Sequence, residues 1–386
     1  MALNYKILGE YIEPITNRNT DLIYSEEDVR GISNTKEIMQ TKARMGYTDL
    51  KNFYVIKPGE FIFNPRTSRN GEKIGVVYNN THQTYIFSFN NIGFKIKNTA
   101  LNELFPEYLF LLFNNPEFDR YARYNSWGSA TELFTWKDMC ETCFNLPSLE
   151  EQKKIVREYQ VIEKRLEILN KFNENLEKYN VLYFQKQIEF QKNNCNYATL
   201  KNLCTIKGGK RLPQGRELSV KPTKHPYIRV RDLNNSIVTQ LNSQYEYLQE
   251  DVYEKLKNYI VKKNDIIISI VGTIGLTAIV GDTLDGANLT ENCVKLTDFN
   301  NISPFYILLF LRTNDGKMAI NNEIVGAVQA KLPIKNVQEI KIPIIPEDNM
   351  NKINKLSAKI FSIISNVQLE VDRLEVIQNK ILKSVY

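Results

Sequence analysis

The chain has 386 residues, of which 42% are hydrophobic, and its 50 basic and 44 acidic residues give a net charge of +6. This length predicts two domains, or three, and the composition excludes a wholly disordered chain. Glycine (17) and proline (13) are too few for a collagenous or low-complexity protein. We find no apolar run of the roughly 20 residues that cross a bilayer and no typical signal peptide. We therefore expect a cytoplasmic protein that does not enter a membrane.

Residues 1–148 are expected to form a globular domain. Strands are predicted at 53–56, 61–63, 74–78, 84–89 and 93–96, followed by helices at 105–113 and 116–124. Strands that precede helices favour an α+β fold over an alternating α/β fold. Two polar loops, NPRTSRNGEK (64–73) and YARYNSWGSA (121–130), combine the side chains that hydrogen-bond to base edges and phosphates. Trp127 in the second loop would stack on bases if exposed, although a tryptophan is more often a core residue.

A long helix is predicted over 149–194. Apolar residues recur there at alternating spacings of four and three, with Asn173 and Asn180 at two positions of the same seam. The apolar members are Ile155, Tyr159, Ile162, Leu166, Leu169, Leu176 and Tyr183. Such heptads predict a coiled coil. The alternative is that this helix and the second long helix, predicted at the end of the chain, are amphipathic helices that lie on separate cores.

Residues 195–345 are expected to form a second α+β domain, and 346–386 a second long helix. Strands are predicted at 227–230, 266–270, 277–280 and 293–296, with a helix at 304–313. The predicted seam of the last helix is Ile353, Leu356, Ile360, Ile363, Val367, Leu374, Ile377 and Ile381. The first long helix leads from one domain to the other, so a helix that pairs with it has to run back. We therefore predict an antiparallel coiled coil between two globular domains related by a pseudo-two-fold axis.

Positive charge is concentrated at the start of the second domain. Residues 201–231 contain nine basic residues and one acid, Glu217. Within this stretch, IRVRD (228–232) is predicted to place Arg229 and Arg231 on one face of a strand, and IKGGKRLPQG (206–215) is a basic loop. Further on, VGTIG (271–275) is a glycine turn whose amides suit phosphate. These features suit an anionic partner such as nucleic acid, while a solvated loop is the alternative that composition leaves open.

The two halves of the chain repeat each other with a period near 198. FPEYLFLLF (105–113) matches SPFYILLFL (303–311), and FNLPSLEEQKKI (144–155) matches IKIPIIPEDNMNKI (340–353). YVIKPGEFIFN (54–64) matches YIVKKNDIIIS (259–269) at an offset of 205. The chain is therefore expected to contain two copies of one unit, each a globular part followed by a helix.

Motifs for catalysis and metal binding are missing from the sequence. There is no phosphate-binding loop of the form G-x-x-x-x-G-K-[ST]. Cys140 and Cys143 form a lone C-x-x-C, which we interpret as two buried small residues, because zinc needs a second pair of ligands. With two histidines and an odd number of cysteines, neither a metal site nor a disulfide framework is expected. The chain is predicted to bind rather than to catalyse.

These features resemble the specificity (S) subunits of type I restriction–modification systems. The resemblance rests on the domain–helix–domain–helix order and on NPRTSRNGEKIG (64–75), PEFDRYARYNSWGSA (116–130), LPSLEEQKKI (146–155), YIRVRDL (227–233) and VGTIG (271–275). One departure is expected in the second repeat, where Gln152 corresponds to Asp348 and a two-residue insertion follows.

The resemblance implies that each globular part is a target recognition domain for one half of a bipartite double-stranded DNA target. The helices would set the unread spacer. The implied partners are two methyltransferase (M) subunits, which bind S-adenosylmethionine and methylate adenine, and the restriction and motor (R) subunits. The chain itself would be non-catalytic and hold no cofactor.

Carried over by position, the resemblance implies DNA contacts in both domains. In the first domain they are Arg66, Ser68, Arg69, Asn70, Lys73, Ser126 and Ser129; in the second they are Lys207, Lys210, Arg211, Arg229, Arg231, Thr273 and Gln329. An ordinary surface or structural role is the alternative for each residue. For the whole chain, the alternatives are a self-contained enzyme and a coiled-coil scaffold that does not bind DNA.

Overall fold

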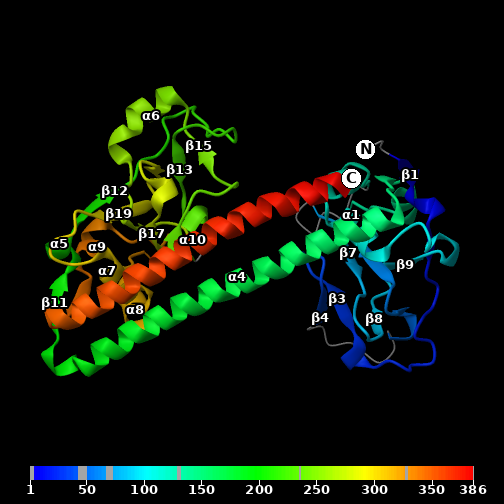
Figure 1. The fold of residues 1–386 in the computed structure, drawn as a ribbon, viewed down its shortest axis with the longest axis horizontal. Helices are drawn as coiled ribbons and strands as arrows, with labels where there is room; N and C mark the ends of the chain where they lie inside the picture. Colours follow the sequence, from blue (N-terminus) through cyan, green and yellow to red (C-terminus); the bar gives the residue numbers. More distant parts are fainter. Residues whose placement is uncertain are drawn as a thin grey trace. The chain divides into compact units, whose positions relative to one another are not determined.

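A computed structural model describes residues 4–41, 50–66, 73–127, 132–233, 236–326 and 329–385. The chain divides into two compact units, and each long helix contributes to both. Unit 1 consists of Met1–Arg165 and Val376–Tyr386, and unit 2 of Leu166–Glu375. Figure 1 labels many of the helices and strands of each unit.

Unit 1 is built on an antiparallel sheet that is followed along the chain by helices. In its described residues the strand order is β2 (Ile12–Pro14), β9 (Ile92–Ile96), β6 (Phe61–Asn64) and β7 (Gly75–Tyr78). Smaller antiparallel pairs are β3 (Arg30–Ile32) with β4 (Ile38–Gln40), β5 (Tyr54–Ile56) with β8 (Tyr85–Phe87), and β1 (Tyr5–Ile7) with β10 (Cys143–Asn145). The helices are α1 (Pro106–Asn114), α2 (Pro116–Tyr124) and α3 (Trp136–Cys140). The predicted α+β class is confirmed, and β1, β2, β3 and β4 were not foreseen.

An aromatic core holds the sheet of unit 1 against α1. The Phe61 and Phe94 rings are stacked with centroids 5.1 Å apart, and Phe113 from α1 meets Phe94 edge-on at 5.8 Å. All three side chains are fully buried. Burial of large rings contributes hydrophobic free energy, and edge-on pairs add to it.

Unit 2 has a mixed sheet with the strand order β12 (Thr205–Gly208), β19 (Cys293–Thr297), β16 (Ile266–Ser269), β17 (Thr277–Val280) and β14 (Val238–Thr239) among its described residues. Beside it are β15 (Glu246–Tyr247), β13 (Pro226–Ile228) and β18 (Asn288–Leu289), and β11 (Asn196–Thr199) pairs with β20 (Lys341–Ile344). The helices are α5 (Leu200–Leu203), α6 (Glu250–Leu256), α7 (Pro304–Arg312), α8 (Asn314–Asn322) and α9 (Ile334–Glu339).

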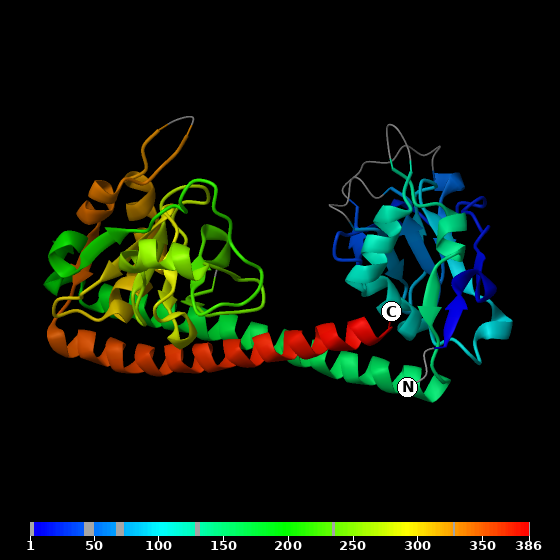
Figure 2. The ribbon, with the colours of Figure 1, turned by 90° about the horizontal axis from the view of Figure 1, so that it is seen from above.

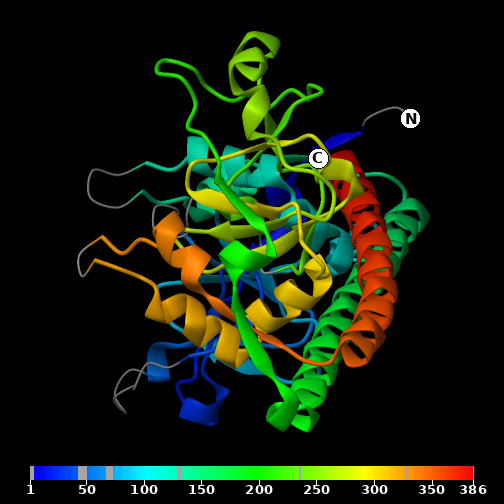
Figure 3. The same ribbon diagram turned by 90° about the vertical axis from the view of Figure 1, so that its left-hand side faces the viewer.

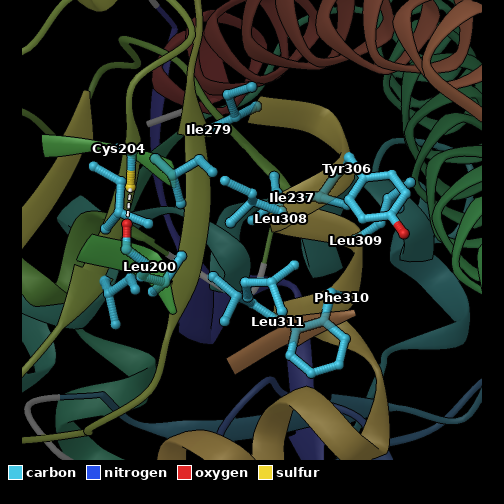
Figure 4. Close-up of a cluster of buried hydrophobic side chains, with 14 of the residues drawn as sticks. Leu200, Cys204, Ile237, Ile279, Tyr306, Leu308, Leu309, Phe310 and Leu311 are labelled. Atoms are coloured by element: carbon cyan, nitrogen blue, oxygen red, sulfur yellow. Dashed lines mark hydrogen bonds between the residues drawn. The ribbon is translucent and has the colours of Figure 1, made fainter. Parts of the chain in front are cut away.

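The core of unit 2 is organised around α7. Its residues Tyr306–Leu311 are all buried, as expected of a helix that is apolar on every side. The helix contacts β17 and β20. Figure 4 shows Leu308 of α7 beside Ile237, and Cys204 donating to the Leu200 carbonyl at 3.5 Å.

The two long helices are α4 (Leu149–Phe190) and α10 (Glu347–Val385). Within unit 2 they lie side by side and run in opposite directions (Figures 1 and 3). Ser357 donates a 3.0 Å hydrogen bond to the Asn180 side chain, and both residues are fully buried among apolar neighbours. Within unit 1, Leu382 and Val385 of α10 join the hydrophobic core. There the Asn115 side chain donates to the Leu382 carbonyl at 2.6 Å, which satisfies a helix-end acceptor.

The buried face of α10 differs from the predicted seam. Ile363 and Ile377 are 43% and 45% exposed, whereas Ile364 and Val371 are buried. Of the other predicted positions of α10, Ile353 and Ile360 are buried, and Leu356, Val367 and Leu374 are half-buried. On α4, Leu166 and Leu169 are buried, and Ile155, Ile162 and Leu176 are half-buried. At the repeat offset of 198, Leu166 and Phe184 of α4 correspond to Ile364 and Leu382 of α10, and all four are buried. The prediction chose Ile363 because it is apolar, although the buried residue is its neighbour Ile364.

The two-residue insertion predicted after Asp348 is also not present. Leu149 begins α4 and Glu347 begins α10, again 198 residues apart. Glu150 is therefore the counterpart of Asp348.

Candidate nucleic-acid interface

Two polar loops that are far apart in the sequence start from neighbouring backbone segments in unit 1. The backbone N–H of Phe134 donates to the carbonyl of Pro65 at 2.8 Å. Trp127 and Leu133 exchange backbone hydrogen bonds of 3.2 and 3.1 Å, and Leu133 also forms a bridge with Arg66. The predicted loops 64–73 and 121–130 are thereby held next to each other where they leave the domain.

The described part of these loops presents a cation and aromatic rings. Lys73 is exposed, and Arg66 is half-buried with its backbone N–H donating to the Asn64 side chain at 3.0 Å. Trp127 is 75% exposed and Tyr124 81%, so Trp127 is not a core residue. Exposed rings beside basic side chains are suited to stacking on bases. The predicted contacts Ser68, Arg69, Asn70 and Ser129 lie outside the described residues.

Ser126 was predicted to contact DNA, but its position in the structure does not fit that role. Its side chain is buried, and its hydroxyl donates to the carbonyl of Ala122 at 2.6 Å. A serine that bonds back to the preceding turn is engaged in ending the helix. Its hydroxyl therefore does not face a ligand in this conformation.

Unit 2 contains the same arrangement of paired loops. Leu332 donates from its N–H to the carbonyl of Ile270 at 2.9 Å, and Val325 and Lys331 exchange backbone hydrogen bonds of 2.9 and 3.0 Å. The turn 271–275, which holds the exposed Thr273, and the hairpin that holds the exposed Gln329 therefore start from neighbouring backbone segments. Figure 2 shows this hairpin, in orange, projecting from unit 2.

The backbone hydrogen bonds that join the paired loops of unit 1 correspond residue by residue to those of unit 2. Phe134 and Leu332 are 198 positions apart, and Trp127 and Val325 are separated by the same offset. Pro65 and Ile270 differ by 205, the second offset of the repeat. Two of the sequence-predicted segments in each domain are thus brought together at one equivalent position.

The positive charge of residues 201–231 is largely matched by acids from other segments. Arg211 lies 2.6 Å from Glu291, Lys201 lies 2.7 Å from Glu339, and Arg216 pairs with Asp251. The local count of nine bases against one acid therefore overstates the free charge. Lys207, Lys210, Lys221 and Lys224 have no acidic partner among the residues that the structure describes.

Arg229 and Arg231 do not lie on a strand. Strand β13 ends at Ile228, and a 3-10 turn covers Val230–Leu233. The Asp232 carboxylate accepts from the Arg229 N–H at 2.8 Å and draws the chain into this turn. Glu246 pairs with both guanidinium groups, at 3.3 Å from Arg231. Burial raises the pKa of Asp232, and its bonds to Arg229 oppose that shift.

Lys295 is a basic residue that the sequence did not single out. It lies opposite Lys207 on neighbouring strands, and both line a pocket with Tyr259. The Lys210 ammonium is 5.7 Å from the centroid of the Tyr259 ring. Asp265 at 3.6 Å and the carbonyl of Ile260 hold the Lys295 ammonium, so Lys207 supplies the cation of this pocket that has no acidic partner among the described residues. The signal in the sequence was a lone lysine in an apolar strand.

Cys140 is half-buried and Cys143 is exposed, so our interpretation of them as two buried residues was wrong. Among the described residues no cluster of His, Cys, Asp and Glu is suited to a metal ion. In the same residues, no helix has an apolar stretch long enough to span a membrane.

The fold of this chain is also found in a solved specificity subunit. It is similar to the crystal structure of the type I restriction–modification S subunit from M. genitalium, with a TM-score of 0.57 at 14% identity over 99% of this chain and 96% of that one. Other similar structures are the HsdS subunit from Thermoanaerobacter tengcongensis (TM-score 0.41, 17% identity, 98% and 95% covered) and a chain of a type I R-M system (TM-score 0.46, 16% identity, 99% and 98% covered).

The family is shown by the sequence itself. The model of the type I restriction modification DNA specificity domain matches twice, at residues 11–178 and 192–379. The chain therefore belongs to this family and contains two copies of its domain.

Proposed function

We propose that this chain is the DNA-specificity subunit of a type I restriction–modification complex. Each unit would read one half of a bipartite double-stranded target, and the long helices would set the unread spacer. The chain would be non-catalytic, with S-adenosylmethionine bound by the partner M subunits.

The observation that carries this proposal is that equivalent backbone hydrogen bonds join two loops in each unit. Both repeats place two loops at the same position through equivalent backbone bonds, Phe134 to Pro65 and Leu332 to Ile270. A shared rigid base with loops of different sequence is an arrangement in which one scaffold can present different base contacts. Exposed Trp127 and Lys73 in unit 1, and Lys207 and Thr273 in unit 2, supply groups suited to bases and phosphates.

An exposed apolar face on α4 supports the docking of partner subunits. Ile168, Phe172, Tyr179, Leu182 and Phe190 are 45–80% exposed and recur at helical spacing on one side of the helix. A row of large apolar side chains on a helix is typical of a surface that another helix covers. We assign it to the M subunits, with R subunits joining the assembled core.

The decisive experiment is a map of modified bases in genomic DNA from cells with and without this chain. We expect methyl-adenine to disappear at one split motif with a fixed gap when the chain is removed. Unchanged methylation in a strain whose M subunit is active would contradict the proposal.

A second measurement tests the absence of catalysis. The purified chain, incubated with target DNA and S-adenosylmethionine, should transfer no methyl group, and adding the M subunit should restore transfer. Methylation by the chain alone would make it an enzyme.

A further inference from the structure

A buried ion pair in unit 1 joins α2 to the β3–β4 hairpin. The Lys36 ammonium lies 2.7 Å from Asp119 Oδ1, and the two side chains are only 5% and 10% exposed. The ammonium also donates to the carbonyl of Phe113, near the end of α1. None of these residues is among those predicted to contact DNA.

The backbone of Lys36 indicates that the fold uses its side chain. Lys36 has φ = 63°, in the left-handed region that glycine and asparagine adopt most readily. Its N–H donates to the carbonyl of Ser33 at 3.1 Å, which closes the hairpin turn. Glycine would make this turn at a lower cost, so the lysine is best explained by the bonds that its ammonium makes.

The same carboxylate also fixes the end of a candidate DNA loop. Asp119 Oδ1 accepts a 3.2 Å hydrogen bond from the N–H of Ile74, the residue that directly follows the segment 64–73. The Lys73 cation is close enough to Lys36 to oppose its charge. The ion pair is therefore attached to the second end of the loop whose first end is held by Leu133 and Phe134.

Three chain segments next to this ion pair lead to candidate DNA contacts. Helix α2, which carries Asp119, ends at Tyr124, three residues before Trp127, and β7 starts directly after Ile74. Arg66 and Thr41, which follows β4, line one pocket together with Asn64 and Asn91. One buried contact thus joins the β3–β4 hairpin, helix α2 and Ile74, the residue that follows Lys73.

Stability alone does not explain such a pair. Desolvation offsets much of the attraction between buried charges, and apolar replacements are often equally stable. Burial is the largest influence on Lys36 and lowers its pKa, while Asp119 counters that effect. Charged hydrogen bonds in a fixed geometry, however, orient the elements that carry them.

We propose that Lys36 and Asp119 are positioning residues that hold Lys73 and Trp127, the described candidate DNA contacts on either side of this ion pair, in their selective arrangement. The pair would determine preference at one half of the target without touching DNA. This inference rests on the proposed function.

The test is the double variant Lys36→Met/Asp119→Asn. It removes both charges and retains an acceptor for the Ile74 N–H. Assembled with M subunits, wild type and variant are compared by methylation of DNA libraries in which each half-site is randomised separately. We expect roughly a tenfold or larger loss of preference at one half-site, comparable to one base contact, and an unchanged preference at the other.

A matched control comes from unit 2, where Arg312 and Glu177 form another largely buried pair, with Arg312 Nε 3.0 Å from Glu177 Oε1 and side chains 13% and 24% exposed. Arg312→Met/Glu177→Gln should leave the half-site read by unit 1 unchanged. If the first double variant does not fold, Lys36→Gln/Asp119→Asn, which keeps a donor for the Phe113 carbonyl, takes its place with the same expectation.

Thermal unfolding separates positioning from stability. A variant that melts like wild type and loses selectivity at one half-site supports the inference. Full selectivity in the variant, or equal losses at both half-sites that follow a lower melting temperature, would overturn it while leaving the proposed function intact. A wild-type complex with no sequence preference would remove the proposed function and the inference together.

Discussion

The hydroxyl of Tyr108 in α1 donates a 2.9 Å hydrogen bond to the carbonyl of Asn145 at the end of β10. In the second repeat Tyr306 of α7 donates to the carbonyl of Pro343 in β20, also at 2.9 Å. Each pair is offset from the other by 198 residues. Burial raises the pKa of both phenols, so each remains a hydrogen-bond donor through the physiological range. In each unit this bond ties the apolar helix to the strand that leads into a long helix.

Replacing either tyrosine by phenylalanine should destabilise the unit that contains it. Tyr108→Phe and Tyr306→Phe each leave a carbonyl without its partner, which costs about 1 kcal/mol. Urea unfolding of the single and double variants measures the effect. Because the sites are in different units, their costs should add, and strong non-additivity would contradict independent roles.

Lys207 and Arg211 should differ in their contribution to DNA binding. Lys207 has no acidic partner among the described residues, whereas Glu291 holds Arg211 at 2.6 Å. In the assembled complex, Lys207→Ala should therefore reduce the slope of log affinity against log salt by about 1. Arg211→Ala, the matched control, should change it less. Equal changes would show that the Glu291 pair does not reduce the availability of Arg211.

Asp372 in α10 should make the stability of unit 2 depend on pH. Burial, with a smaller contribution from Glu375, raises its pKa from 3.8 to about 6, and its Oδ2 has no hydrogen-bond partner among the described residues. The folded state therefore holds the proton more tightly than the unfolded chain. The resulting stabilisation is fully present below pH 3.8 and is lost as pH rises through about 6.

Asp372→Asn should accordingly stabilise the protein near pH 7, by at most about 3 kcal/mol. It should also flatten the stability curve between about pH 4 and 6. Chemical unfolding across this range measures both effects, with Glu217→Gln on an exposed loop as the control. A variant that is less stable than wild type at pH 7 would contradict the assigned protonation.

Local patterns in the sequence predicted the regular elements well because those elements depend on nearby residues. The heptads of α4 and the apolar run of α7 specify their helices through spacing that is visible in the chain. The exposed Ile363 shows the limit of this approach, because apolar character alone does not tell which of two adjacent residues is buried. The repeat offset, applied from Leu166, would have selected Ile364.

The candidate site depended on long-range contacts that no local pattern contains. The acids that pair with Arg211 and Arg229 come from distant segments or from beyond the strand end. Lys36 finds Asp119 across 83 positions. Such partners are set by tertiary packing, so the sequence predicted which loops matter and not which charges remain free.

The bond between Asn115 and Leu382 spans 267 positions and has a consequence for synthesis. Leu382 and Val385 complete the core of unit 1, yet they follow the whole of unit 2 along the chain. At translation rates of roughly 5–20 residues per second, unit 1 waits on the order of 10–40 s for them. During that interval the nascent core of unit 1 leaves apolar surface uncovered, and such exposed surface is prone to aggregation. Completion of unit 1 is thereby coupled to synthesis of unit 2.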